Sequence, residues 1–514
     1  MLNATDFLNS VERIGNRLPH PATLFIVAFA LVIVFSAVVS GLGWSVTKPP
    51  LDGSAEADII VANNLLAADG VWWILSHLVE NFISFPPLGI VLVGMLGIGV
   101  AERSGFIPAL LTRLATTVPA QFLTPAVMFL GIVSSVGLDA GYVVLPPIAA
   151  ALYIAAGRSP LAGIAVSFAG ISAGFSANVI ITAVDPLLAG FTQAGAQFVD
   201  GTYQVAATAN WWFMAVSAIL LTFVGWIVSA RFVEPRLAQQ GTANLGDDEF
   251  ATPNTAVEVE GRGLRNAMFA LGLMTIAIAA GVFIPDAPLS GDGVRFARWI
   301  EVTVPLIFLL FFVPGVVYGF TTGRFKRERD VAKAMGDTIS ALGPYIVLAF
   351  FAAQFIEAFK YSRLGEMLAI TGGNFLVELG LPTSALMVGF ILIVMLGNLL
   401  IGSASAKYAF FAPVFVPMLM YVGVSPELTQ AAYRIGDSTT NIITPLNPYM
   451  VIIVALVQRF RPEAGVGSIV AMMLPYTVAF AIVWISLLLL WLSIDLPLGP
   501  GGPLSYESAV PRPP

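Results

Sequence analysis

The stretch AAYRIGDSTTNIITPLNPYMV (residues 431–451) is charged and broken by prolines, although it lies within an otherwise membrane-like segment. Arg434 and Asp437 are three residues apart, so on a helix they share one face. Pro445 and Pro448 each remove a backbone donor that a continuous helix needs. Such a segment is tolerated at membrane depth only where it faces protein or a water-filled cavity. We therefore expect the rest of the chain to build that cavity.

The composition is that of an integral membrane protein. Of the 514 residues, 57% are hydrophobic and only 11% are charged, which lies outside the range of soluble globular proteins. Apolar runs of about 20 residues, the length that crosses a hydrocarbon core, recur along the chain and predict an all-α polytopic bundle. The sequence contains no cysteine, which excludes disulfides and thiolate chemistry. The polar opening residues lack a small-residue cleavage site and are interpreted as a cytoplasmic lead-in.

The order of apolar segments predicts nine transmembrane helices and two re-entrant hairpins. The predicted spans cover residues 20–43, 71–101, 159–190, 210–230, 266–284, 300–320, 338–359, 431–451 and 468–492. The hairpins are predicted at residues 121–157, with the polar tip SSVGLDAG, and at residues 383–423, with the polar tip GSASAK. The third span is expected to be interrupted around residues 175–185. Residues 106–117 are too short to span and are expected to lie along the cytoplasmic interface.

The distribution of basic residues predicts the orientation. With the N-terminus in the cytoplasm, most lysines and arginines fall on the cytoplasmic side, including the basic cluster GRFKRERDVAK (residues 323–333). Reading either hairpin as a single crossing would invert much of this distribution. We therefore expect a multi-pass protein with a cytoplasmic N-terminus and an exterior C-terminus.

The two hairpin units resemble each other in sequence. Residues 129–163 align without a gap with residues 395–429, matching a Leu-Gly pair, a polar tip, a tyrosine, a proline and a Ser-Pro pair. Beyond them, Asn178-Val-Ile-Ile-Thr182 corresponds after a small shift to Asn441-Ile-Ile-Thr444. In the predicted topology the first hairpin opens to the cytoplasm and the second opens outward, so the repeats are inverted. Inverted repeats with interrupted segments indicate a secondary transporter with its site near the midplane.

Four motifs make the sequence similar to the AbgT family, the p-aminobenzoyl-glutamate transporters. They are SSVGLDAGYVVLPP, AGFSANVIIT followed by Asp185, GSASAKYAFFAPVFVPM, and YRIGDSTTNIITPLNPY. The resemblance covers essentially the whole chain. It implies a homodimer in the bacterial inner membrane that transports p-aminobenzoyl-glutamate or p-aminobenzoate-like compounds, with sulfonamide export in some members. The positions that match the family's functional residues are Asp185, Ser405, Arg434, Asp437 and Pro445. The family commonly has tryptophan at the position of Tyr408, which leaves the substrate of this chain open.

The charged residues suggest substrate binding and ion coupling. Arg434 matches a carboxylate with two parallel hydrogen bonds, so we interpret it as an anion clamp or as the partner of Asp437. The alternative is that these two side chains only neutralise each other. Asp185 and Asp437 are candidates for cation or proton carriage, because a membrane-buried carboxylate is costly unless it is paired, metal-bound or protonated. For Asp185 the alternative is a solvated helix cap. Lys407 could bind an anion or a carboxylate, or reach out to the membrane surface.

Sodium is the candidate metal ion, because small oxygen-bearing side chains occupy both interrupted units. Unwound backbone carbonyls at broken helices supply further hard oxygen ligands. The candidate ligands are Ser135, Asp139 and Asn178 in the first unit, and Ser403, Thr440 and Asn441 in the second. The same residues also suit hairpin turns and helix packing, Asp139 in particular. Asn178 and Asn441 are also candidate substrate contacts.

Other functional classes are disfavoured. Gly170-Ile-Ser-Ala-Gly174 fits the nucleophile-elbow pattern, but no strand precedes it and both histidines are distant in sequence. Ser405 with Lys407 is weak evidence for a hydrolase. No nucleotide-binding motif is present, so transport driven by ATP is disfavoured. We expect no enzyme activity, no cofactor other than sodium, and no nucleic-acid partner. The open alternatives are a sodium-coupled symporter of another carboxylate and a channel.

The expected organisation has a transport core that moves against a scaffold, driven by a proton or sodium gradient. Residues 121–190 and 383–457 form the core, each with one hairpin and one interrupted helix. Residues 1–120 and 191–382 supply scaffold helices and connecting arms, and residues 458–514 supply the last helix and an exterior tail. The expected partners are an aromatic carboxylate or sulfonamide, Na⁺ or H⁺, the bilayer and a second subunit.

Overall fold

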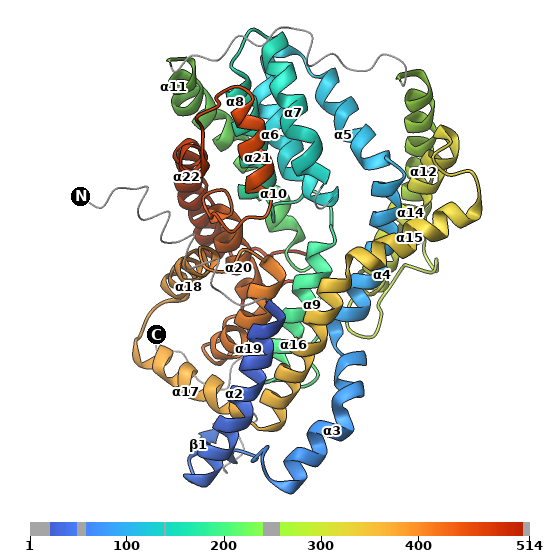
Figure 1. Cartoon of the computed structure of the whole chain (residues 1–514). Coiled ribbons are helices and arrows are strands. Elements are labelled where there is room, and N and C mark those ends of the chain that lie inside the picture. The colour runs from blue at the N-terminus through green and yellow to red at the C-terminus, as the bar shows by residue number, and fades with distance from the viewer. Residues whose placement is uncertain (1–20, 49–57, 138–139, 240–256, 507–514) are drawn as a thin grey trace.

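A computed structural model describes residues 21–48, 58–137, 140–239 and 257–506. Helices make up most of this part of the chain. The one sheet among the described residues is a two-stranded antiparallel hairpin of β1 (Ser45–Lys48) and β2 (Asp58–Val61). It lies at the lower end of the molecule in Figure 1, opposite the ends of α11 (Glu234–Gln239) and α12 (Val257–Phe283). These opposite ends correspond to the two sides of the membrane in the predicted topology.

One connected set of helices packs beside the repeat units, and we call it the scaffold group. It consists of α2 (Pro21–Gly41), α3 (Ala68–Ile83), α4 (Pro86–Arg103), α12, α14 (Thr303–Thr322), α15 (Glu328–Ala341) and α16 (Gly343–Tyr361). Helix α14 packs against both α4 and α12, and α2 packs against α16. Only 6% of the residues in the most apolar stretch of α12 are buried, so most of this helix faces outward.

The first repeat unit folds into a hairpin and a broken helix. Its elements are α6 (Leu123–Val133), η2 (Ser134–Gly137), α7 (Ala140–Ala155), α8 (Pro160–Phe168), the π-helical turn η3 (Ala169–Ala173) and α9 (Val184–Ala196). Residues 174–183 between η3 and α9 are not helical, which confirms the predicted interruption. Gly170 lets η3 cross α6 closely, because an added Cβ would lie 2.6 Å from the Met128 carbonyl oxygen.

The second repeat unit has the same order of elements. They are α18 (Thr383–Asn398), α19 (Ala404–Tyr421), α20 (Pro426–Thr440) and α21 (Met450–Gln458). Ser425 caps α20 by accepting a hydrogen bond from the Leu428 amide, and Pro426 occupies the first turn, where a missing N–H costs nothing. The second break contains Pro445 and Pro448, which cannot donate to a continuous helix.

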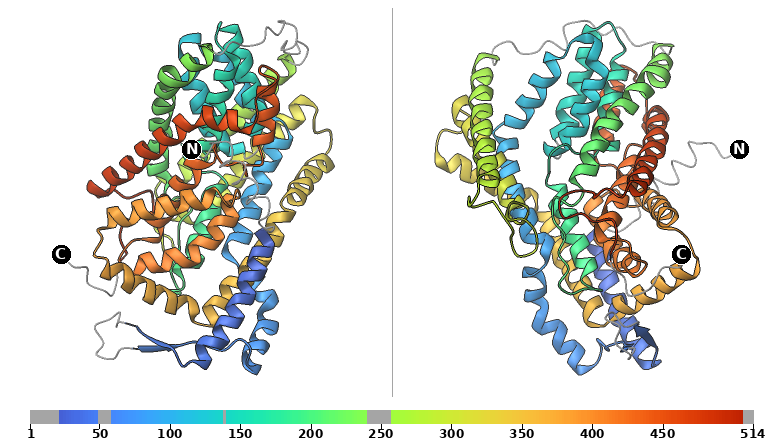
Figure 2. Two further views of the ribbon diagram at one scale, coloured as in Figure 1. Left: turned by 60° about the vertical axis from the view of Figure 1, so that its left-hand side comes forward. Right: turned by 180° about the vertical axis from the view of Figure 1, so that it is seen from behind.

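The remaining elements connect and flank the two units. They are α5 (Phe106–Thr117), η1 (Ala120–Phe122), α10 (Trp211–Val228), η4 (Ser229–Val233), α11, α13 (Arg298–Glu301), α17 (Leu364–Glu378) and α22 (Val466–Ser493). Helices α10 and α22 pack against each other, α10 packs against α6, and α22 packs against α20. They therefore pack with the repeat units, and we call this assembly of α6–α10 and α18–α22 the core group. It is wider than the expected transport core, because it adds α10 from residues 191–382 and α22 from residues 458–514. Figure 2 shows α12 and α22 on opposite sides of the molecule.

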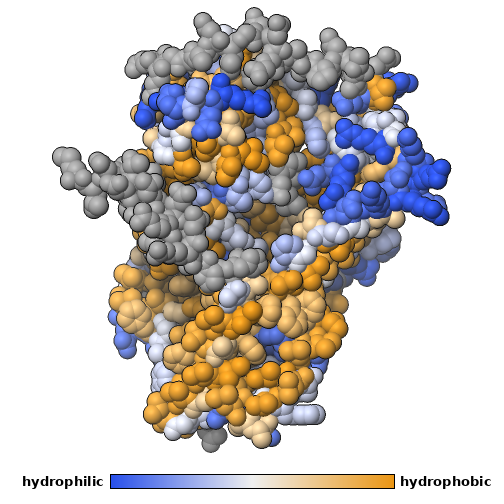
Figure 3. Space-filling view, in the orientation of Figure 1, coloured by the Kyte–Doolittle hydropathy of each residue, from blue (hydrophilic) through white to orange (hydrophobic). Residues whose placement is uncertain are grey.

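The described helices fit a membrane protein, although length and composition alone do not give nine spans. Six helices are long and apolar enough to cross a membrane, or up to eight if each of two bent pairs is one span. The interrupted helices of the repeat units are not included in this number, because each half is too short to cross a membrane. One bent pair joins α5 to the first hairpin at an angle of 114°. Hydrophobic side chains cover most of the lower part of the face in Figure 3, and hydrophilic ones gather toward its upper end.

The two repeat units interlock. Helix α19 of the second hairpin packs against α9 of the first unit, and α21 of the second unit packs against α7 of the first hairpin. Helix α20 also contacts η3. In Figure 1 the hairpin of α6 and α7 lies in the upper half of the molecule, and α18 and α19 lie in the lower half. Consequently the two helix breaks meet in the middle.

Candidate functional site

Each helix break hydrogen-bonds to the opposite repeat unit. Asn441 donates to the Ser172 carbonyl oxygen at 3.4 Å, and Asn447 donates to the Ser172 hydroxyl at 3.0 Å. The Ser176 amide donates to the Ser438 hydroxyl at 3.2 Å. Non-helical backbone leaves polar groups that lipid cannot satisfy, so each unit supplies partners for the break of the other. The meeting point of the breaks is therefore polar, buried and shared by both repeats.

An ion pair joins the two units at this point. Arg434 Nη1 on α20 lies 2.7 Å from Asp185 Oδ1 in the first turn of α9, and Arg434 Nη2 donates to the Ser176 carbonyl oxygen at 2.8 Å. The other oxygen of Asp185 accepts from the Thr182 amide at 2.7 Å and the Thr182 hydroxyl at 3.0 Å. Arg434 is fully buried and Asp185 is 4% exposed. A carboxylate in the first turn also interacts favourably with the helix dipole.

A second buried ion pair lies on the same helix. Asp437 Oδ1 is 2.6 Å from Lys407 Nζ of the second hairpin, with side-chain exposures of 1% and 0%. Three of the alternatives are therefore wrong: Arg434 and Asp437 do not pair with each other, Asp185 is not a solvated cap, and Lys407 does not reach the surface. The interpretation of Lys407 as the partner of a carboxylate is confirmed. The reason is tertiary, because α9 and α19 each bring an opposite charge to a different position on α20.

Asn398 at the end of α18 connects Lys407 to the second break. Its side-chain oxygen accepts a hydrogen bond from Lys407 Nζ. Its amide nitrogen lies 2.8 Å from the Thr440 hydroxyl and 2.9 Å from the Asn441 side-chain oxygen. Sequence reasoning missed Asn398, although a lone asparagine at the end of an apolar hairpin helix is a signal that could have found it.

Two aromatic residues border the charged pairs. Tyr433 donates to the Ala404 carbonyl oxygen at 2.7 Å and to Asp437 Oδ1 at 3.2 Å. Its ring centroid lies 4.1 Å from that of Tyr408, and the Tyr408 hydroxyl lies 2.7 Å from the Thr192 hydroxyl of α9. Both tyrosines are buried. Tyr408 is a site residue predicted from the sequence, whereas Tyr433, which opens the YRIGD motif, is not among the predicted ones.

The tyrosines at aligned positions of the two hairpins each contact the opposite repeat unit. Tyr142 in the first hairpin occupies the position that aligns with Tyr408 in the second. Its ring stacks on that of Tyr449 in the second break, with centroids 4.0 Å apart and planes inclined by 10°. Each hairpin therefore presents an aromatic ring to the opposite unit. The repeat seen in the sequence thus extends to side-chain contacts.

The structure brings together part of the first candidate sodium group. Ser135 donates to the Asn178 side-chain oxygen, and Asn178 donates to the Thr182 hydroxyl at 3.3 Å. Asp139 lies outside the described residues. All three of the described side chains are buried.

The tip of the second hairpin is partly open. Ser403 and Ser405 are half-buried, with their hydroxyl oxygens 3.3 Å apart. Pro445 is half-buried in the second break. Within the described residues, no three side chains of His, Cys, Asp or Glu gather to hold a metal ion. Sodium binding would therefore rely mainly on hydroxyl, carboxamide and carbonyl oxygens.

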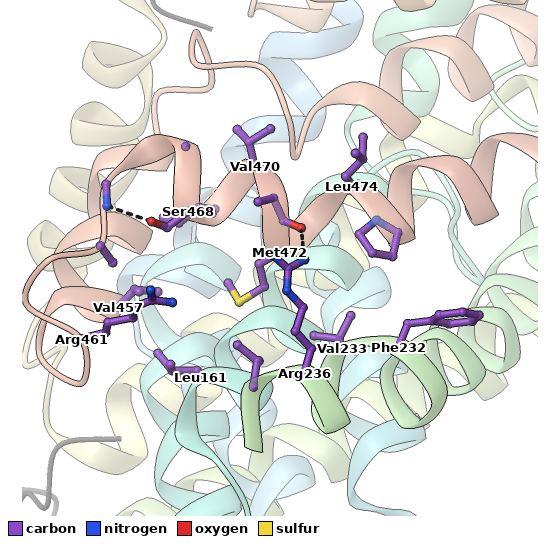
Figure 4. A pocket seen from close by; sticks show the side chains of 17 residues that line it. Leu161, Phe232, Val233, Arg236, Val457, Arg461, Ser468, Val470, Met472 and Leu474 are labelled. Carbon is purple, nitrogen blue, oxygen red and sulfur yellow. Dashed lines mark hydrogen bonds between the residues drawn. The ribbon is translucent and has the colours of Figure 1, made fainter. Parts of the chain in front are cut away.

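One cavity lies away from this cluster. It has a volume of about 850 Å³ and lies between α22 and the η4–α11 segment, with Arg236 and Arg461 among mainly apolar residues (Figure 4). Arg236 donates there to the Ala471 carbonyl oxygen at 3.2 Å. None of the site residues predicted from the sequence lines this cavity. The charged residues of the two ion pairs are buried within the protein and do not line this cavity.

Comparisons with known proteins agree with this architecture. The model of the AbgT transporter family matches residues 6–506. The chain belongs to the AbgT transporter family. It is 36% identical over 496 residues to the p-aminobenzoyl-glutamate transport protein of Escherichia coli K12, covering 96% of this chain and 95% of that protein.

Two AbgT-family proteins of known structure resemble this chain. The YdaH transporter of Alcanivorax borkumensis gives a TM-score of 0.89 at 41% identity, covering 94% of this chain and all of that one. MtrF of Neisseria gonorrhoeae, described as illuminating a class of antimetabolite efflux pumps, gives 0.87 at 43% identity over 97% of this chain and all of that one. The AbgT-family chain is therefore a membrane transporter and not an enzyme.

Proposed function

We propose that this AbgT-family protein transports p-aminobenzoyl-glutamate or related aromatic carboxylates and sulfonamides by a secondary-active mechanism. The observation that carries the proposal is the Arg434–Asp185 pair at the crossing of the two breaks. Support for the substrate class comes from the E. coli relative, which is named for p-aminobenzoyl-glutamate transport, and from MtrF, which is described among antimetabolite efflux pumps.

Arg434 has the chemistry to bind such a substrate. Its contact with Asp185 is an ion pair that is not aligned as a hydrogen bond, and within the described residues Nε and Nη1 donate no hydrogen bond. A guanidinium with free donors can bind a carboxylate or a sulfonyl group through two parallel N–H bonds. Asp185 would then exchange Arg434 for a proton or sodium ion, which couples substrate to ion.

The neighbouring aromatic rings suit the aromatic part of such a substrate. Tyr408 and Tyr433 lie on α19 and α20, and Asp437 accepts a hydrogen bond from Tyr433. Stacking of a p-aminobenzoyl ring on one of these faces would orient its carboxylate toward Arg434. Ser405, Pro445, Asn178 and Asn441 would line the remainder of the site.

Transport requires movement, because the charged residues are enclosed. We propose that the core group moves as a unit against the scaffold group, in an elevator-like cycle driven by a proton or sodium gradient. The packing of α4 on α9 and of α16 on α19 is the boundary along which this movement would occur. The protein would work as a homodimer in the bacterial inner membrane, with its N-terminus in the cytoplasm and its C-terminus outside.

Counterflow in proteoliposomes tests the proposal. Vesicles are loaded with unlabelled p-aminobenzoyl-glutamate or p-aminobenzoate, and uptake of the labelled compound is followed under separate sodium and pH gradients. Uptake should follow one gradient and should be lost in Arg434→Ala. The control is Arg262→Ala, an exposed arginine on α12, which should transport normally.

Other outcomes favour the alternatives. Uptake of a different carboxylate with sodium, but not of these compounds, would indicate a symporter with another substrate. Flux far faster than an alternating-access cycle would indicate a channel. Counterflow that is equal in Arg434→Ala and in the natural chain would contradict the role of Arg434.

A further inference from the structure

In the second unit, a side-chain ammonium is linked through Asn398 to two of the candidate sodium ligands. Lys407 Nζ contacts Asp437 Oδ1 at 2.6 Å and the Asn398 side-chain oxygen. Asn398 in turn contacts Thr440 and Asn441, two of the residues that the sequence suggests as sodium ligands. Two oxygen atoms that could bind a cation in this unit, those of Asp437 and Asn398, therefore already contact a cation that is covalently attached to the protein.

The chemistry of the ammonium matches that of a bound sodium ion. Both carry a single positive charge, and the three N–H donors of Lys407 need oxygen or π partners just as sodium needs oxygen ligands. Besides the two oxygens, the Tyr433 ring lies over Lys407, with its centroid 5.9 Å from Nζ. Asp437 is 1% exposed, so without Lys407 its charge would be buried and uncompensated.

The first unit cannot hold an equivalent side chain. The position that aligns with Lys407 is Gly141. A Cβ atom added there would lie 2.3 Å from the Ser134 hydroxyl oxygen. The buried Ser135, Asn178 and Thr182 of this unit therefore have no lysine at the matching position. Thr182 contacts Asp185, whose charge is paired with Arg434 of the second unit. The two units share a fold, but only the second has a lysine at this position.

We propose that the Lys407 ammonium takes the place of a coupling cation in the second unit. Sodium, where it binds, then binds in the first unit only, and removal of the Lys407 amine turns Asp437, Asn398 and Thr440 into a new sodium site. The consequence for ion coupling rests on the proposed transport function. The binding itself does not, because it is a property of the purified protein.

Thermal unfolding and ²²Na⁺ binding of purified Lys407→Ala test the inference. In choline chloride we expect a lower Tm than that of the natural chain, because Asp437 has lost its counter-charge. Sodium chloride should restore much of this Tm, and the variant should bind one more sodium ion per chain than the natural protein. The control is Lys407→Ala with Asp437→Asn, in which no charge needs compensation. Its Tm should be the same in sodium and in choline.

Two results would overturn the inference. The first is a folded Lys407→Ala whose Tm and sodium binding are the same as those of the natural chain. The second uses Thr440→Ala with Lys407 in place, and is available even if Lys407→Ala does not fold. A decrease in sodium binding in that variant would show that Thr440 binds sodium beside Lys407, whereas unchanged binding supports the inference. Neither measurement depends on transport. Both can therefore be interpreted even if the counterflow experiment fails.

Discussion

At the scale of single residues, the site consists of two buried ion pairs whose members come from different elements. Arg434 and Asp437 both lie on α20, and their partners lie on α9 and α19. Taking charges out of water is costly, and an ion pair offsets the cost only when both members are present and well placed. The pairs are therefore poor sources of net stability but strict requirements for a folded site.

Asp185→Asn should destabilise the protein strongly. It leaves the Arg434 guanidinium buried beside a neutral carboxamide, and breaking a buried pair in this way costs about 3–5 kcal/mol. The matched control is Glu463→Gln, which breaks the exposed contact of Arg461 with Glu463 and should cause no measurable loss. Unfolding in detergent by heat or denaturant compares the variants. Equal effects of the two substitutions would mean that Asp185 is not held in a buried pair.

At the scale of elements, close helix crossings fix the position of the first break. Turn η3 can approach α6 only because Gly170 and Gly131 have no side chains, and an added Cβ on Gly131 would lie 3.0 Å from the Gly170 Cα. The residues that face the site, including Ser172 and Ser176, follow directly along the chain. Packing at this crossing therefore determines where Arg434 and Asn441 find their partners.

Gly170→Ala should disturb both folding and transport. The new methyl group would meet the Met128 carbonyl oxygen at 2.6 Å, and overpacking of this kind costs about 1–3 kcal/mol. The control is Gly272→Ala on α12, where nothing lies within 4 Å of the added Cβ. Because alanine favours helix more than glycine, that variant should gain up to about 1 kcal/mol. The Tm values of both variants measure the difference, and a neutral Gly170→Ala would show that α6 and η3 can move apart freely.

At the scale of the whole molecule, aromatic packing joins the core group to the scaffold group. Phe410 on α19 lies 4.7 Å, between ring centroids, from Phe25 on α2, and 5.8 Å from Phe355 on α16. These contacts carry no polar bond that must break when the groups move. A sliding movement could exchange one apolar neighbour for another at low cost.

A cross-link between the cysteines of the double variant Phe25→Cys with Phe410→Cys should stop transport. The natural chain has no cysteine, so the pair is the only thiol pair in the double variant. Mercuric ion should bridge the two thiols and abolish counterflow, and a reducing thiol should restore it. Each single-cysteine variant, treated in the same way, is the control. Full counterflow in a completely bridged protein would contradict relative movement of the two groups at this contact.

The sequence by itself determined the membrane class, the two hairpins and the two interrupted helices. These follow from local features: apolar length, prolines that remove backbone donors, and polar tips inside apolar segments. The internal repeat also predicted that the interrupted helices correspond, and η3–α9 and α20–α21 do.

Only the tertiary structure decided which charges pair. Arg434 and Asp437 are three residues apart, and that spacing permits a contact on a helix without requiring it. Asp185, Lys407 and Asn398 come from elements whose approach to α20 depends on packing across the whole core. A buried charge pairs with the opposite charge that this packing places closest to it. The distance between two such side chains cannot be predicted from a local sequence pattern.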